Sequence, residues 1–468
     1  PDGRLLLATT EFPDFGPLPV VDPQSESPAA TQLRRLVARG RANGFDGIVY
    51  ENRDRGHSAI SKKEFPSLVH LSFGPELRKA NLDYGLGGRI LSPFVTLGNS
   101  STALTAGPNW RSLPRYAMTQ PGLPNRLYQS YRSNQIYVYP EHRDHDERDL
   151  FPANWPYSIQ SQGSSGSDQV FLHAIAMTLA AFPEETLARL KADGLVAPTL
   201  QMILRRESSP VRTEEDYLKG AAHLVAFEKE FLRAGRMIAR AAAMTPDKVP
   251  PLVMLQVIEE SFVDVAGLGQ RSEKLFDTPS AIARLWRSTG GRQSMIVSTA
   301  NTTDPNGRPL TFVWRVLSGD PEKVRITPLD ADGTLARIEI DWHDPFTRAT
   351  RASQEDKRVS SRVDIGVFAS NGAHISAPGF ISVAFPSHQV RQYTDGPNGV
   401  PTPVSIDYDA AGRDAYLDPL LYWSAPWTDA FTEGGIARRM HTSGQAVAPG
   451  DLTLDRSDGA FPTLQQQP

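Results

Sequence analysis

Short apolar runs alternate with amphipathic stretches along the first part of the chain. Residues 5–9 and 47–50 are apolar runs of strand length. Between them, Ser27 and Pro28 have the order typical of a helix start, and apolar residues at helical spacing follow until Gly44. A strand, a helix and a second strand in succession predict the βαβ arrangement of an α/β or α+β domain.

Helical patterns dominate the next part of the chain. Apolar residues recur at helical spacing over residues 167–190 and, as the longest such pattern, over residues 214–243. Residues 252–258 form an apolar run that predicts a strand, and Thr278-Pro279 predicts the start of a short helix that runs through Arg287.

The pattern changes to short, alternating runs bounded by turns after residue 290. The turn sequences include Asp304-Pro305-Asn306-Gly307 and Asn371-Gly372. Closely spaced short strands predict an immunoglobulin-like all-β sandwich. The predicted strands lie at residues 294–299, 310–317, 323–326, 336–340, 361–368 and 379–385.

These patterns predict three parts. Residues 1–290 form an α/β (or α+β) domain that is the candidate catalytic domain, and residues 293–386 form the immunoglobulin-like sandwich. Residues 387–468 are predicted to be an aromatic, partly extended C-terminal tail. A chain of 468 residues is too long for one ordinary hydrophobic core, which agrees with this division.

Composition narrows the classes of function. The chain has a net charge of −4, which argues against nucleic acid as a partner. No apolar run approaches the ~20 residues of a membrane span. The sequence contains no cysteine, so disulfides, thiolate zinc sites and a cysteine nucleophile are excluded. The composition is compatible with a polymeric or a small-molecule substrate, and the sequence indicates no particular protein partner.

Polar turns follow several strand-like runs, at residues 51–58, 98–102, 141–146 and 163–168. In α/β folds the active site lies outside the carboxyl ends of the strands. We therefore expect these turns to line one shared hollow.

The turn at residues 141–146 is rich in imidazole and carboxylate groups. Asp144, His145 and Asp146 are the candidate ligands for a divalent metal, which these residue types allow to be Zn²⁺, Mg²⁺ or Ca²⁺. His142 is a candidate general base beside them. The alternative is a solvated loop in which Arg143 and Arg148 pair with the carboxylates.

A Gly/Ser turn precedes the helical pattern that begins near residue 167. Successive backbone N–H groups in such a turn can bind an anion or a developing oxyanion. Ser164 and Ser167 are therefore candidate substrate-binding residues, and Ser165 is a candidate nucleophile. The alternative is an ordinary helix cap made by Ser167 or Asp168.

The tetrad Asp54-Arg55-Gly56-His57 resembles the Asp-Arg-Gly-His signature of the ββα-metal class of non-specific nucleases. The resemblance implies a general-base role for His57 and a magnesium-holding role for Asn99 or Asn109, with Asp54 and Arg55 at the site. The gap between His57 and these asparagines is longer than in that family. The alternative is that Asp54 pairs with Arg53 or Arg55 to shape a turn.

The turn at residues 304–307 and the following strand with Trp314 resemble the polycystic-kidney-disease-type and related immunoglobulin-like modules of bacterial exported proteins. Such a module covers about a fifth of the chain. The stretches NRDRGHS, GNSSTA and YPEHRDHD are likewise similar to segments of exported bacterial proteins. The resemblance implies an accessory carbohydrate- or protein-binding unit and a periplasmic or extracellular location.

The leading prediction is a hydrolase, with metal assistance as an option, that acts on a glycan or another polymer. His57 or His142 would be its base, and Tyr139 and Trp155 would border its substrate. One alternative is the metal-dependent nuclease. The other is a non-catalytic glycan- or protein-binding protein, whose stacking platform would be Tyr131, Tyr137, Tyr139, Trp155 and Tyr157.

Overall fold

Five parallel strands form the centre of the N-terminal domain, in the order β3-β2-β5-β6-β7. The residues of β5, β6 and β7 are buried throughout, which is typical of parallel strands covered on both faces. The strands are β2 (Ile48–Asn52), β3 (Val69–His70), β5 (Val95–Asn99), β6 (Gln135–Pro140) and β7 (Ile159–Ser161). The predicted α/β domain is thereby confirmed.

This computed structural model describes residues 5–7, 11–12, 14–86, 88–101, 110–142, 148–264, 271–349, 357–411, 421, 424–433, 435–447, 452–455 and 463–466. Among these residues, no single helix is both long and apolar enough to span a membrane. Helices α5 and α6 reach that length and composition only as a pair, bent by 109° at their junction.

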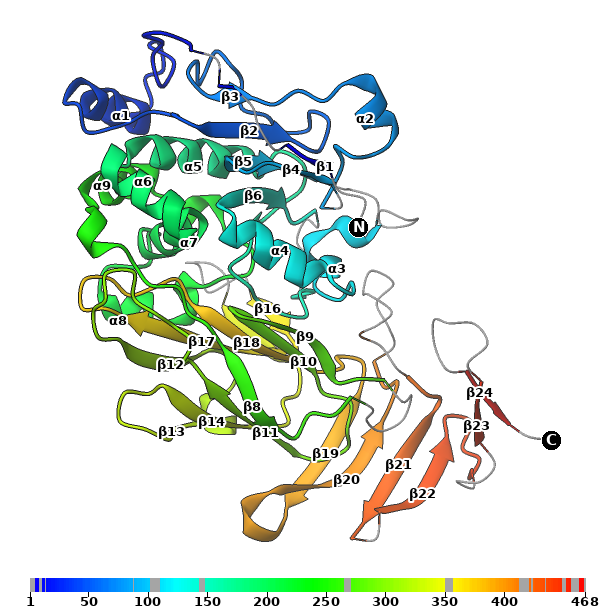
Figure 1. The fold of residues 1–468 in the computed structure, drawn as a ribbon. Coiled ribbons are helices and arrows are strands. Elements are labelled where there is room, and N and C mark those ends of the chain that lie inside the picture. The colour runs from blue at the N-terminus through cyan, green and yellow to red at the C-terminus, as the bar shows by residue number, and fades with distance from the viewer. Residues whose placement is uncertain are drawn as a thin grey trace.

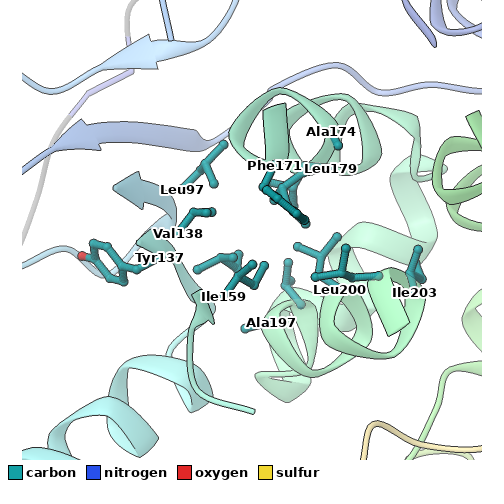
Figure 2. Close-up of a cluster of buried hydrophobic side chains, with 14 of the residues drawn as sticks. Leu97, Tyr137, Val138, Ile159, Phe171, Ala174, Leu179, Ala197, Leu200 and Ile203 are labelled. Carbon is teal, nitrogen blue, oxygen red and sulfur yellow. The ribbon is translucent and has the colours of Figure 1, made fainter. Parts of the chain in front are cut away.

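Helices pack against this sheet and against one another (Figure 1). Leu97, Val138 and Ile159 of the sheet cluster with Phe171 of α5 and Leu200 of α7, as Figure 2 shows. The helices are α1 (Pro28–Ala38), α2 (Pro75–Lys79), α3 (Pro114–Ala117), α4 (Leu123–Arg132), α5 (Gln169–Ala181), α6 (Glu184–Asp193), α7 (Val196–Arg206), α8 (Glu214–Tyr217) and α9 (Ala234–Ala243).

The long helix predicted over residues 214–243 is two helices, α8 and α9, separated by irregular backbone. Phe227 lies in this break and extends the parallel sheet, because its N–H donates to the Gln160 carbonyl at 2.7 Å. Gly220 approaches the backbone of the second domain so closely that a Cβ there would overlap the carbonyl oxygen of Leu317. Tertiary contacts therefore override the helical spacing.

Two sheets form the second part, antiparallel except where β10 pairs in parallel with β18, and they confirm the predicted β-sandwich (Figure 1). Their orders are β12-β17-β18-β10-β9 and β13-β14-β11-β8, and a cluster with Trp286, Trp314 and Trp342 fills the space between them. The strands are β8 (Gln256–Glu260), β9 (Lys274–Thr278), β10 (Ala281–Leu285), β11 (Arg292–Ser298), β12 (Thr311–Ser318), β13 (Val324–Pro328), β14 (Leu335–Asp341), β17 (Arg362–Ser370) and β18 (Gly379–Ala384).

The sandwich strands begin at Gln256, earlier than the residue 293 expected from the sequence. The segment expected to be a short helix after Pro279 is instead strand β10, which pairs in parallel with β18. All residues of β10 are buried, and a short run buried on both sides shows no period that separates strand from helix.

The remaining pairs are two-residue or peripheral strands, and a further small sheet follows the sandwich. In the region predicted to be a partly extended tail, β19 (Val390–Asp395), β20 (Pro401–Asp407), β21 (Trp427–Thr432) and β22 (Gly435–His441) form an antiparallel sheet. Ile406, Tyr408 and Trp427 give it a core of its own. The remaining strands are β1 (Leu5–Leu6), β4 (Ile90–Leu91), β15 (Phe346–Ala349), β16 (Lys357–Ser360), β23 (Leu452–Asp455) and β24 (Thr463–Gln466).

Candidate active site

Two aspartates meet at the carboxyl ends of β2 and β5, and we call Asp54 and Asp168 the aspartate pair. Asn99 is the last residue of β5, Asp54 lies two residues beyond β2, and Asp168 immediately precedes α5. The Asn99 Nδ2 lies 2.9 Å from the Asp54 Oδ2 and 3.4 Å from the Asp168 Oδ2. One amide group therefore holds two carboxylates that come from separate elements.

Neighbouring groups fix the orientation of this amide. The Tyr50 hydroxyl donates to the Asn99 Oδ1 at 2.7 Å, so the Asn99 Nδ2 must face the carboxylates. The same Nδ2 also donates to the Ser58 carbonyl at 2.9 Å, and the Ser58 hydroxyl donates to the Asp168 Oδ1. The pair is thus fixed by side chains that are themselves held in place.

The sequence Asp54-Arg55-Gly56-His57 forms a tight turn around the first carboxylate. The Asp54 Oδ1 accepts the backbone N–H groups of Gly56 at 2.9 Å and His57 at 3.1 Å. Gly56 has a φ of 109°, which a glycine adopts without strain. Arg53 pairs with Glu51 at 2.9 Å and Arg55 pairs with Asp83 at 3.0 Å, so neither arginine is the partner of Asp54.

Both carboxylates of the pair are buried. Asp54 is 2% exposed and Asp168 is 0% exposed. Burial raises the pKa of Asp168, and the adjacent Asp54 carboxylate raises it further, while hydrogen bonds from Ser58 and Asn99 oppose this. Burial also raises the pKa of Tyr50 to about 12, so its hydroxyl stays a donor. A proton on Asp168 would remove the repulsion between the two carboxylates. One protonated and one ionised carboxyl group is an arrangement that acid–base catalysis uses.

A second buried cluster lies beside the pair. Glu51 accepts hydrogen bonds from the Arg53 Nε at 2.9 Å and from the Tyr137 hydroxyl. Burial raises the pKa of Tyr137 well above its ordinary value of 10.0. Tyr139 stacks on Tyr137 with ring centroids 6.1 Å apart. This cluster braces the ends of β2 and β6.

The predicted aromatic platform is part of the core. Tyr139 is 3% exposed and Trp155 is 1% exposed, so neither offers a face to a substrate in this conformation. The other three platform residues, Tyr131, Tyr137 and Tyr157, are also buried. The expected open stacking strip is therefore wrong, because the rings pack against one another and against the adjoining helices.

The predicted bases lie at the rim of this sheet edge. The His57 side chain is exposed, and among the described residues it has no hydrogen bond or ion pair with a carboxylate. His142 is half-buried, and its N–H donates to the Gly163 carbonyl at 3.0 Å. This contact brings the 141–142 and 163–168 turns together, whereas Asp144, His145 and Asp146 lie outside the described residues.

The Gly/Ser turn keeps its serines near the surface. Ser164 and Ser165 are exposed, and the Ser167 hydroxyl lies 2.7 Å from the Ser161 hydroxyl at the end of β7. Asp168 makes no side-chain cap for α5, because its carboxylate is used by Ser58 and Asn99. The roles of these serines as oxyanion-binding or nucleophilic groups remain predictions.

Metal ligation is not apparent in the described residues, which hold no group of three or more His, Asp or Glu side chains arranged to bind an ion. Asn99 was a candidate ligand by its resemblance to nucleases, but both ends of its amide are used by protein groups. A divalent metal therefore remains a prediction that concerns Asp144, His145 and Asp146.

Three residues of the site were not among the predicted ones: Tyr50, Ser58 and Asp168. Tyr50 reads as part of a buried strand, and Ser58 as the end of a polar turn. From the sequence, Asp168 is a possible helix cap, at the end of a turn that is expected to line the hollow. Ser58 and Asp168 are 110 positions apart in the sequence, so no local pattern pairs them.

No protein-family model and no curated protein matches this chain. Among solved structures, the N-terminal Ig1-2 module of the Drosophila receptor protein tyrosine phosphatase DLAR has 13% identity and a TM-score of 0.14, over 30% of this chain and 56% of its own. A nucleoside hydrolase-related protein from Saccharophagus degradans, described as associated with carbohydrate metabolism, has 9% identity and a TM-score of 0.21, over 78% of this chain and 89% of its own.

An endo-fucoidan hydrolase from glycoside hydrolase family 107 has 10% identity and a TM-score of 0.17, over 64% of this chain and 52% of its own. The chain thus spans only about half the length of two of these three proteins. The similarities to an immunoglobulin-like module and to carbohydrate-associated, hydrolase-related proteins are distant, and they establish no specific function.

Proposed function

We propose that the chain is a hydrolase whose acid–base groups are the aspartate pair. The observation that carries the proposal is that Asn99 holds Asp54 and Asp168 together, buried, at the carboxyl edge of a parallel sheet. This edge is where α/β folds place their catalytic groups. Structural ion networks can also bury carboxylates, but two acids on a single amide, to which no Lys, Arg or His side chain of the described residues is paired, differ from an ordinary ion pair.

In this proposal the two acids have different roles. Asp168, whose pKa burial raises, donates a proton to the leaving group as its bond to the substrate breaks. Asp54 accepts a proton from the attacking water, so the pair ends the step with one proton, now on Asp54, and proton exchange with solvent returns it to Asp168. Gly56 and His57 are exposed and bonded to Asp54, which makes their turn the rim through which a substrate would approach.

The substrate we propose is a glycan or another polymer, and the sandwich would be accessory to its binding. His142 and the serines at residues 164–167 border the same sheet edge and would contact the substrate. A divalent metal held by Asp144, His145 and Asp146 would supply a Lewis acid, but no step above depends on it. We also propose a periplasmic or extracellular location.

The test is hydrolysis of a panel of polysaccharides and 4-nitrophenyl glycosides, measured as released reducing ends and 4-nitrophenolate. We expect Asp54→Asn and Asp168→Asn each to lower kcat/KM on the best substrate about 100-fold or more. The matched control is Glu207→Gln, which changes a buried carboxylate held by Arg236 and Arg240 in the same domain. Wild-type rates in both folded aspartate variants would overturn the proposal.

The alternative function is non-catalytic binding of a glycan or a protein. It is favoured by one observation: protein groups already satisfy the amide of Asn99 and the hydroxyl of Ser58. Such a network can simply brace a fold. Binding of a panel polysaccharide to the wild-type chain without release of reducing ends, and unchanged binding in Asp54→Asn, would support this alternative.

A further inference from the structure

A cavity of about 350 Å³ lies where three parts of the chain meet. We call it the junction cavity. One wall is the segment 148–152 of the N-terminal domain, and another is the end of the sandwich at β10, β17 and β18. Pro345, Val359, Ala411 and Leu421 also line the cavity. At about 30 Å³ for each water molecule, this space equals roughly a dozen waters, which is the size of a small organic molecule.

Most of the lining is apolar. Leu150, Phe151, Leu285, Val359 and Phe385 contribute side chains from different elements. Sites for small molecules are typically apolar hollows at domain interfaces, with a few polar groups that fix the orientation of the ligand. The junction cavity has the size, the place and the lining of such a site.

One wall of the cavity is charged. Asp149 and Arg362 line it, and both side chains are almost fully buried. The Arg362 Nη2 lies 3.1 Å from the Asp149 Oδ2, and the same guanidinium binds Asp364 at 2.7 Å. A buried charge without compensation is costly, so the sum of the charges at this wall decides which ligand it accepts.

Positive charge is in excess at this wall. Burial opposes ionisation of Asp149, but the guanidinium groups of Arg362, Arg348 and Arg358 lower its pKa below the ordinary value of 3.8. Asp149 is therefore ionised at neutral pH. Among the described residues, the charged groups that line this wall are Arg148, Arg362 and Asp149, and Asp149 and Arg362 interact with Arg348, Arg358 and Asp364, which do not line it. The arginines outnumber the aspartates by two.

We propose that the junction cavity binds a small organic anion, with an apolar body in the hollow and a carboxylate or sulfonate group toward Arg148. Arg148 is exposed at the lining, and Asp149 next to it is held by a bond from its N–H to the Val359 carbonyl at 2.8 Å. The Arg148 guanidinium can therefore reach an anion without breaking an internal ion pair among the described residues. This site is separate from the aspartate pair, and it does not depend on the proposed hydrolase activity.

The probes are four molecules of eight carbon atoms each that differ in their polar group: octanoate, 1-octanol, octylammonium and, as a second anion, 1-octanesulfonate. Titration calorimetry on the full chain is expected to show binding of octanoate, at least tenfold weaker binding of 1-octanol, and no binding of octylammonium. A comparison of octanoate with 1-octanesulfonate shows which anionic group the wall prefers. Raising the NaCl concentration is expected to weaken binding of the anions alone.

The test variant is Arg148→Ala, because this exposed side chain can be removed without disturbing the core. We expect it to weaken octanoate binding at least fivefold and to leave 1-octanol binding unchanged. The matched control is Arg337→Ala, which removes an exposed arginine from β14 in the other sheet of the sandwich. Each of three results would overturn the proposal: no octanoate binding at about 10 mM, equal binding of octanoate and 1-octanol, or unchanged octanoate affinity in Arg148→Ala.

Discussion

The sequence around Asp168 allows two interpretations of this side chain, as a helix cap or as part of the site. A Ser-Asp pair before an apolar helix indicates a cap, since these residues satisfy the free N–H groups of the first turn. In the structure the carboxylate turns away from α5 and accepts from Ser58 and Asn99 instead. The sequence shows that Asp168 precedes a helix. Whether its carboxylate caps that helix or accepts from Asn99 depends on β5, which lies far away in the chain.

The burial of Asp168 leads to a prediction about stability and pH. Its pKa in the folded protein is raised above the ordinary value of 3.8, so the folded state binds this proton more tightly than the unfolded state. Its contribution to stability is therefore complete below pH 3.8 and is lost as the pH rises through the folded-state pKa. An amide at this position does not titrate, yet it can accept from Asn99 and donate to Ser58.

We expect the free energy of unfolding of Asp168→Asn, relative to wild type, to rise with pH over that window, measured by urea unfolding from pH 4 to pH 8. Asp216→Asn is the control with the opposite sign, because hydrogen bonds from Lys219 and Thr213 lower the pKa of Asp216. The stability from Asp216 is present above pH 3.8 and lost as the pH falls below it, so a companion series from about pH 2 to pH 4 is expected to show this variant losing stability relative to wild type as the pH rises. A difference for Asp168→Asn that does not vary with pH would contradict the raised pKa.

The end of β5 explains why a polar turn was expected where a strand continues. Gly98 and Asn99 belong to β5, although Gly-Asn followed by serines is typical of a turn. A Cβ on Gly98 would meet the Tyr137 Cδ1 at 2.6 Å. The glycine therefore lets the Tyr137 ring of β6 lie across β5, where its hydroxyl reaches Glu51.

Gly98→Ala is accordingly expected to destabilise the protein by about 1–3 kcal/mol, the usual cost of an extra methyl group in a packed interior. Denaturant unfolding at neutral pH measures this cost. Gly74→Ala is the matched control, since no atom lies within 4 Å of a Cβ there, and we expect a change within about 0.5 kcal/mol. Equal stability of Gly98→Ala and wild type would show that the Tyr137 ring can move away freely.

The elements predicted from the sequence were those with a clear local period. The α1 helix has such a period, and β2 is a short apolar run that follows Gly47 and ends in polar residues. The polar turns after β2 and before α5 supply the aspartate pair of the candidate site. β10 could not be distinguished from a helix, because Ala281–Leu285 is buried on both sides and its partner β18 lies about a hundred residues away. Long-range pairing, which no local window contains, also separates α8 from α9 at Phe227.

The same long-range contacts determine where the N-terminal domain ends and the sandwich begins. A cut near residue 290 would separate β8 from its partner β11, and β10 from its partner β18. The apolar core of the N-terminal domain also extends into the sandwich. The sandwich residues in that core are Ala281, Ala283, Phe368 and Ala377. The fold class is as predicted, whereas the two parts share a core that the change in sequence pattern does not reveal.

Because of this shared core, we expect the N-terminal domain and the sandwich to unfold in one cooperative transition. Polar contacts reinforce the junction: the Tyr157 hydroxyl lies 2.6 Å from the Thr278 hydroxyl and accepts the Ser280 N–H at 3.1 Å. Hydrogen exchange with mass spectrometry can follow α5 in the first part and β17 in the second at increasing urea concentration. Both segments are expected to lose protection at the same midpoint.

Tyr157→Phe makes this expectation sharper. It leaves the buried Ser280 N–H without its acceptor, which costs about 1–3 kcal/mol. If the two parts are one cooperative unit, α5 and β17 must shift to lower urea by the same amount, although the substitution lies outside both. If instead β17 shifts while α5 keeps its wild-type midpoint, the two parts unfold independently and the shared core contributes little to their coupling.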